Sequence, residues 1–100
     1  MQTYVLMTTL TPGCIRDAEE RRVKGKEWLA KVHKACPEVK WIAHYALLGR
    51  YDFMDVYQAP DDATAHKVSL ITRGEGALMA ESWPAMAWEH HLALLEEIGA

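Results

Sequence analysis

A histidine and a carboxylate near the middle of the chain are the side chains best suited to chemistry. His44 lies within residues 41–48 and Asp55 within residues 51–58, two runs rich in aromatic and aliphatic residues. Gly49-Arg50 separates the runs, so we predict two strands joined by a two-residue type II′ turn. In that register His44 faces Asp55. A carboxylate beside an imidazole fixes its tautomer and raises its basicity, which makes the pair a candidate catalytic base.

The same turn sets the rest of the hairpin. Side chains of a strand alternate between the two faces of a sheet. One face therefore carries four predicted cross-strand pairs, which are Leu48 with Tyr51, Ala46 with Phe53, His44 with Asp55, and Ile42 with Tyr57. The alternative interpretation of His44 and Asp55 is structural, as two polar groups that satisfy each other at a subunit interface.

Five further residues are candidates for contact with a small molecule. Tyr51 and Tyr57 share the face of His44, and Asp52 follows the turn at the mouth of the predicted pocket. Tyr45 lies on the other face of the hairpin, and Trp83 offers a ring on which an aromatic ligand can stack. Each has a structural alternative. Asp52 can hold the turn through backbone hydrogen bonds, Tyr51 can close the end of the sheet, and Trp83 can anchor a core or an interface.

The sequence offers no strong pattern for a metal or a cofactor. Glu89-His90-His91 is expected on a helix, where adjacent residues point about 100° apart and do not share a ligand site. The chain has no His-x3-His or Cys-x2-Cys spacing. Gly74-Glu75-Gly76 is too short for a phosphate loop and follows a helix instead of preceding one. We therefore expect no metal and no cofactor.

Length and composition indicate one small domain over residues 1–100. Half of the residues are hydrophobic and the net charge is −3, which argues against a nucleic-acid-binding protein. Basic residues nevertheless cluster before the hairpin, where we interpret them as a solvated helix face; they are Arg16, Arg21, Arg22, Lys24, Lys26, Lys31, Lys34 and Lys40. Cys14 and Cys36 are expected to be free thiols in a reducing compartment. No signal peptide or membrane span is expected, so we predict a cytoplasmic protein.

The order of predicted elements defines a fold class. Strands are expected at 4–10, 41–48, 51–58 and 77–83, and helices at about 15–35, 61–73 and 85–98. Gly25, inside the first helix, suggests a break or a close packing contact. The order βαββαβ with a C-terminal helix predicts an α+β, ferredoxin-like domain whose first and third strands are central.

Both faces of the predicted hairpin are apolar, and this pattern indicates an oligomer. An antiparallel sheet with one face in water should alternate apolar and polar residues. Helices of the same chain can cover one face, but 100 residues leave little to cover the other. We therefore expect a homodimer or a larger homo-oligomer.

Four motifs resemble the GYD-domain family of small bacterial proteins. They are Tyr4-Val5-Leu6 with Leu10-Thr11-Pro12, then Leu48-Gly49-Arg50-Tyr51-Asp52-Phe53, then Ala59-Pro60-Asp61-Asp62, and last Glu81-x-Trp83-Pro84. The resemblance covers roughly residues 1–88. It implies a ferredoxin-like monomer whose sheet packs on that of its mate to form a dimeric α/β barrel. It implies no established reaction, because proteins with this barrel include cofactor-free oxygenases, muconolactone isomerases, haem enzymes and amino-acid-sensing domains.

Three functions remain open at this point. The first is an oligomer that binds a small apolar or aromatic molecule between sheet and helices. The second is a cofactor-independent oxygenase or isomerase that uses His44 and Asp55. The third is a structural or regulatory assembly module without a ligand. A pocket beside His44 would favour the first two.

Overall fold

The computed structural model describes residues 1–13 and 17–100. Along this part of the chain the elements are β1 (Gln2–Leu10), α1 (Ala18–Ala35), β2 (Lys40–Ala46), β3 (Phe53–Ala59), α2 (Asp62–Gly74), β4 (Ala77–Ala85) and α3 (Trp88–Glu97). The predicted order of strands and helices is confirmed. The predicted start of the first helix near residue 15, and Cys14, lie outside the described residues.

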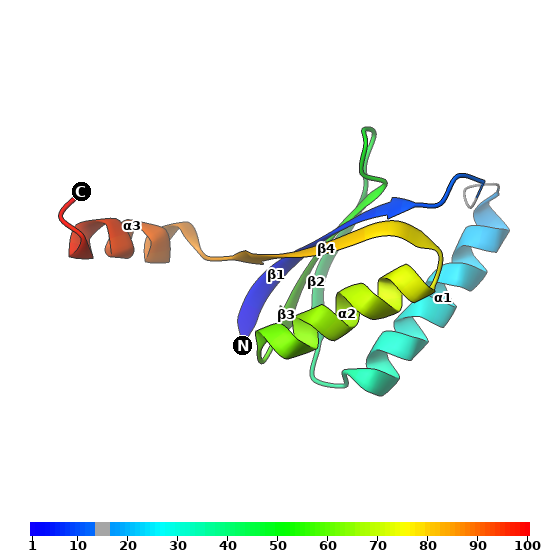
Figure 1. The fold of residues 1–100 in the computed structure, drawn as a ribbon, viewed down its shortest axis with the longest axis horizontal. Helices are drawn as coiled ribbons and strands as arrows, with labels where there is room; N and C mark the ends of the chain where they lie inside the picture. Colours follow the sequence, from blue (N-terminus) through cyan, green and yellow to red (C-terminus); the bar gives the residue numbers. More distant parts are fainter. Residues whose placement is uncertain (14–16) are drawn as a thin grey trace.

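The four strands form one antiparallel sheet in the order β2-β3-β1-β4, with the first and third strands central as predicted. Helices α1 and α2 lie on the same side of this sheet (Figure 1). The core lies between them and the sheet. Its largest fully buried side chains are Tyr4, Leu6, Val32, Tyr57 and Val68. The rings of Tyr4 and Tyr57 stack at the centre with their centroids 5.5 Å apart.

Aspartates cap the two helices that cover the sheet. The Asp17 carboxylate accepts a hydrogen bond of 2.8 Å from the Glu20 amide at the start of α1, and Asp61 accepts one of 2.8 Å from Thr64 at the start of α2. Helix α1 is continuous through Gly25, and a Cβ atom placed there would meet no heavy atom of the described residues within 4 Å. The predicted break or close contact at Gly25 is therefore wrong.

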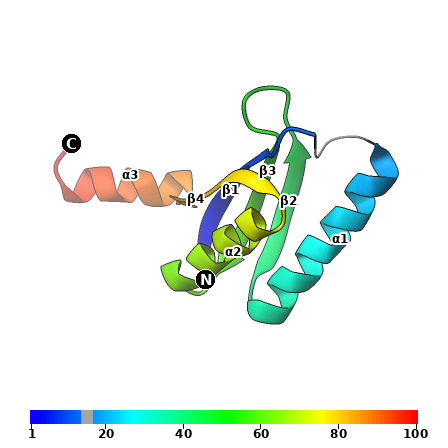
Figure 2. The same cartoon turned by 45° about the vertical axis from the view of Figure 1, so that its right-hand side comes forward.

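Helix α1 leaves space between its N-terminal half and the sheet. Its C-terminal half is anchored in the core by Val32 and by the adjoining Cys36. The backbone of α1 approaches α2 more closely than any strand. In Figure 2 its N-terminal end diverges from the sheet. The resulting gap is where a cavity forms.

The hairpin between β2 and β3 differs from the prediction at both ends. The strands end at Ala46 and begin again at Phe53, so a loop of residues 47–52 replaces the two-residue turn. Gly49 does not have the positive φ that a type II′ turn requires. An irregularity between Trp41 and Ala43 pairs Trp41, not Ile42, with Tyr57.

This β-bulge reverses the faces of two side chains. Trp41 turns toward the helices, where its ring centroid lies 5.0 Å from that of Trp28. Ile42 is 58% exposed. Beyond the bulge, the predicted pairs of His44 with Asp55 and Ala46 with Phe53 are confirmed.

The C-terminal helix stands apart from the rest of the chain (Figure 1). Strand β4 continues through Pro84 to Ala85, beyond its predicted end, because proline is tolerated in an edge strand. Within the described residues, α3 makes no close contact with another element. Trp88 at its start is 66% exposed.

Candidate functional site

His44 and Asp55 form a hydrogen-bonded pair on the face of the sheet that the helices cover. The His44 Nδ1 atom lies 2.5 Å from Asp55 Oδ1. The Asp55 side chain is 4% exposed and the His44 side chain 60%. Burial raises the pKa of the Asp55 carboxyl, and its charge and hydrogen-bond interactions with His44 oppose that rise. A carboxylate that accepts from Nδ1 leaves the Nε2 atom of His44 to meet a ligand, as a hydrogen-bond acceptor or as a base.

The pair opens into a groove of about 620 Å³ between α1 and the sheet. Sheet residues that line it include Thr8, Leu10, Trp41 and Phe53. The His44 ring stacks on Phe53 with centroids 5.5 Å apart. The groove therefore joins an aromatic and aliphatic floor to a single oriented imidazole.

One face of α1 forms the opposite wall. This face carries Arg21 and the residues four, seven and eight positions after it, which are Gly25, Trp28 and Leu29. The Trp28 indole N–H donates to the Thr72 hydroxyl over 2.9 Å and thereby ties α1 to α2. Gly25 leaves the middle of this wall without a side chain.

Two predicted ligand residues have structural roles. Tyr57 is fully buried beneath the helices, its hydroxyl lies 2.7 Å from that of Ser82, and burial raises its pKa to about 12. The Asp52 carboxylate accepts a hydrogen bond of 2.6 Å from the Leu10 amide, and its own amide donates to the Thr8 carbonyl over 2.7 Å. Asp52 thus ties the hairpin loop to β1, which supports the structural alternative for this residue.

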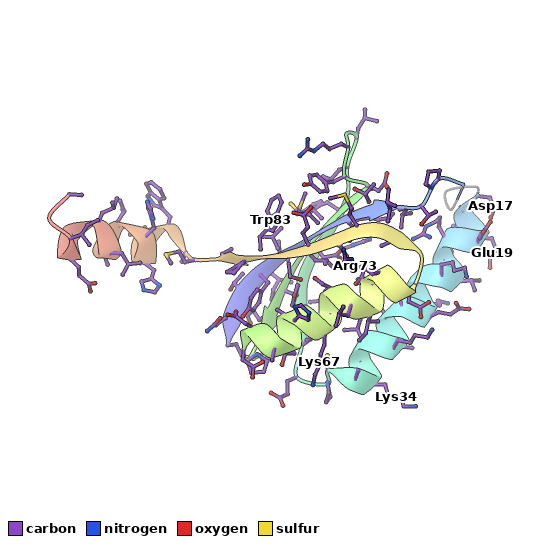
Figure 3. The ribbon with its side chains drawn as sticks, viewed as in Figure 1. Asp17, Glu19, Lys34, Lys67, Arg73 and Trp83 are labelled. Atoms are coloured by element: carbon purple, nitrogen blue, oxygen red, sulfur yellow. The ribbon has the colours of Figure 1, made fainter. Side chains whose placement is uncertain are left out.

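The other three predicted ligand residues lie away from the groove. The Tyr51 ring meets Trp83 edge-on with centroids 6.0 Å apart, and both residues bond to Glu81. Trp83 projects from β4 on the side away from α2 (Figure 3). Tyr45 lies on that same uncovered face of the sheet and is 57% exposed. The prediction that Tyr51 shares the face of His44 is wrong, because the wider loop carries it to the other side.

A smaller cavity of about 410 Å³ lies between α2 and β4. Its lining is more polar and includes Tyr4, Asp62, His66 and Arg73. The Asp62 carboxylate there accepts a hydrogen bond of 2.6 Å from the Tyr4 hydroxyl. This cavity lacks the apolar floor of the groove beside His44.

The described residues do not gather into a metal site. Among them, no three His, Cys, Asp or Glu side chains lie together in an arrangement that would hold an ion. The Cys36 thiol is free and buried, and burial raises its pKa. No helix in the described part of the chain combines the length and the apolar character needed to cross a membrane.

Fold and groove together define a small ferredoxin-like α+β protein with an apolar cavity under its first helix. The chain belongs to the GYD domain family, whose model matches residues 4–95. It is 33% identical over 81 residues to a Thermus thermophilus protein named glutamine synthetase and cystathionine beta-lyase binding protein. That match covers 78% of this chain and 81% of the relative.

Two solved structures share the fold. The crystal structure of FFRP-DM1 has a TM-score of 0.51 at 22% identity, covering 86% of this chain and all of that chain. The hypothetical protein PHS023 from Pyrococcus horikoshii also has a TM-score of 0.51, at 24% identity, covering 91% of this chain and 96% of that one. At these identities the likeness concerns the fold alone.

Proposed function

We propose that this GYD-domain protein binds a small apolar or aromatic molecule in the groove between α1 and the sheet. The groove itself, about 620 Å³ with Trp28, Trp41 and Phe53 on its walls, is the observation that carries the proposal. Its size falls within the range of ligand cavities, roughly 300 to 1,000 Å³, and such cavities are mainly apolar with a few fixed polar groups. His44, held by Asp55, is one such group.

Catalysis by His44 is an alternative function for the same groove. An oriented imidazole can act as a base in a cofactor-independent oxygenase or isomerase, and it can equally hold a ligand through one hydrogen bond. Replacement by glutamine separates the two roles, because the amide can still hydrogen-bond but cannot take up a proton at neutral pH. A catalytic role predicts that His44→Gln abolishes turnover and preserves binding.

Filling the groove tests the binding function. Gly25→Leu places a side chain on the wall where a Cβ has free space, so the helix should tolerate it. Ala30→Leu creates the same side chain at an exposed position of the same helix outside the groove and is the matched control. Calorimetric titration with indole, a neutral aromatic probe, should show saturable binding to the wild type and to Ala30→Leu.

For Gly25→Leu we expect at least about a tenfold loss of indole affinity. Absence of saturable binding to the wild type would refute the proposal. Equal affinity in Gly25→Leu and the wild type would place the site elsewhere.

Self-association is a second proposed property, and it concerns the uncovered face of the sheet. Two rows of side chains cross this face, namely Tyr45-Met54-Met7-Glu81 and Ala43-Val56-Val5-Trp83. All but Glu81 are apolar or aromatic. A face of this kind marks a protein interface, and a second copy of the sheet supplies a complementary apolar cover.

The isolated helix α3 supports the same proposal. Trp88, Leu92 and Leu95 recur at helical spacing, yet α3 meets no other element in the described chain. A ten-residue helix gains most of its stability in proteins from tertiary packing. We infer that this stripe packs on the second copy.

Sedimentation of two charge variants tests the interface. Tyr45→Glu places a charge on the uncovered face, and Leu70→Glu places one on α2 at the smaller cavity between α2 and β4, where Leu70 is 52% exposed. The wild type and Leu70→Glu should sediment as a dimer or larger, and Tyr45→Glu as a monomer. A monomeric wild type in dilute solution would refute self-association.

The name of the Thermus relative adds enzymes as candidate partners for this chain. That protein is described as binding glutamine synthetase and cystathionine beta-lyase. We propose a protein-binding role of the same kind here. Surface plasmon resonance of the immobilised chain against both enzymes would detect this binding. The absence of a saturable signal with either enzyme would refute the proposed protein-binding role.

A further inference from the structure

The groove carries a cation without a carboxylate partner at the end nearest the start of α1. Arg21 is half-buried, and its guanidinium carbon lies 5.5 Å from the centre of the Phe53 ring. Its Nε atom is shielded from solvent and has no hydrogen-bond partner among the described residues. Buried N–H donors of this kind are normally satisfied, so this one needs an acceptor.

Most other charged side chains at the groove are paired, and Lys24, which lines it without an ion pair among the described residues, is exposed, which distinguishes half-buried Arg21 from it. The pairs are Arg22 with Glu19 at 3.3 Å, Lys31 with Glu75, and His44 with Asp55 at 2.5 Å. Among the described residues, Arg21 has an aromatic contact but no ion pair. A ligand acceptor at Arg21 therefore displaces no existing ion pair.

The chemistry of a guanidinium edge specifies the acceptor. Its two terminal nitrogens present a parallel pair of N–H donors that matches the two oxygens of a carboxylate. Phe53 lies directly beneath the guanidinium, and Trp28 continues the apolar wall. A carboxylate bound at Arg21 would thus carry an aromatic or branched aliphatic body onto these rings.

The two acids farther along the groove restrict the number of charges on the ligand. Asp55 and Glu75 both line it, so a second carboxylate on the ligand would meet negative charge there. We propose, on the basis of the function proposed above, that the groove selects a small apolar monocarboxylate whose acid group binds Arg21. The neutral counterpart of the same molecule is then the weaker ligand.

Matched probes and matched variants test this selection. The probes are 3-phenylpropionate and its uncharged analogue 3-phenylpropionamide, titrated calorimetrically into the full chain. Arg21→Met keeps an unbranched side chain over Phe53 and removes the charge. Lys26→Met removes one positive charge from the same helix at an exposed position outside the groove.

In the wild type we expect the acid to bind at least about tenfold more tightly than the amide. Arg21→Met should lose that preference, so that acid and amide bind this variant about equally, while Lys26→Met should keep it. The comparison of probes on the wild type needs no variant, so it stands if Arg21→Met folds poorly.

Each failure has a distinct meaning. Equal affinity for acid and amide in the wild type would overturn the selection by Arg21 and leave the groove as a site for neutral molecules. Equal losses in Arg21→Met and Lys26→Met would attribute the preference to net charge and likewise overturn it. No binding of either probe, together with no binding of indole, would overturn the proposed function as well.

Discussion

Replacing Asp52 with alanine should destabilise the fold by about 2 kcal/mol, because this side chain fastens the hairpin loop to the central strand. Its carboxylate accepts the Leu10 amide at 2.6 Å, and the backbone amide of Asp52 donates to Thr8 at 2.7 Å. Alanine keeps the second bond and loses the first. A hydrogen bond to a charged group contributes roughly 1.5–3 kcal/mol, and the partly buried Leu10 amide would be left without its acceptor. Both Leu10 and Thr8 line the groove, so the loss also loosens its floor.

Thermal and urea unfolding followed by circular dichroism measures the effect. For a domain of this size, a loss of about 2 kcal/mol lowers the Tm by roughly 10 °C. Asp52→Asn retains an oxygen acceptor and should lose about half as much. Glu96→Ala, which removes an exposed carboxylate from α3, is the control and should change the free energy of unfolding by less than about 0.5 kcal/mol.

One result would refute this reasoning directly. If Asp52→Ala unfolds like the wild type within about 0.5 kcal/mol, the carboxylate does not hold the loop. Loss of ligand binding in such a stable variant would then assign Asp52 to ligand contact, the alternative that its position after the loop suggests.

Two further predictions concern the groove. Burial raises the pKa of Asp55, so the folded chain keeps this proton to a higher pH than the unfolded chain does. The associated stability is present below the ordinary value of 3.8 and is lost as pH rises through the raised value. Urea unfolding between about pH 4 and pH 7 should therefore show Asp55→Asn gaining stability relative to the wild type as pH increases, and a difference that is flat or falls with pH would contradict this sign. Trp28→Phe removes the hydrogen bond to Thr72 and should cost about 1–2 kcal/mol in the same assay, and a loss below about 0.5 kcal/mol would show that this bond does not anchor α1.

The alternation of side chains was enough to predict the His44–Asp55 pair, but not the ends of the hairpin. The pairing survives because the bulge lies beyond it, between Trp41 and Ala43. A bulge adds one residue to a strand without a clear signal in the sequence, and here it exchanges the faces of Trp41 and Ile42. The width of the loop was also not predictable from local sequence. It depends on a hydrogen bond between the Asp52 carboxylate and the Leu10 amide of β1, which lies far from the hairpin in the sequence.

The binding residues were harder to predict because they depend on how α1 lies over the sheet. Tyr57 was assigned to the correct face of the sheet. The helices bury that face at Tyr57 and leave it open beside His44, so Tyr57 does not reach the groove. Arg21, Gly25 and Trp28 were not proposed as ligand contacts, although their spacing of four and seven residues already placed them on one helix face. Whether a helix face lines a cavity depends on the distance between the helix and the sheet, and the sequence pattern does not specify that distance.

The tryptophan indole N–H signals give the most direct test of the groove. The chain has four tryptophans, and Trp28 and Trp41 line the groove while Trp83 and Trp88 lie outside it. In a titration of the ¹⁵N-labelled chain with indole, the signals of Trp28 and Trp41 should shift together and saturate, and those of Trp83 and Trp88 should stay in place. Saturating shifts confined to Trp83 or Trp88, or no shifts at all, would contradict a ligand site between α1 and the sheet.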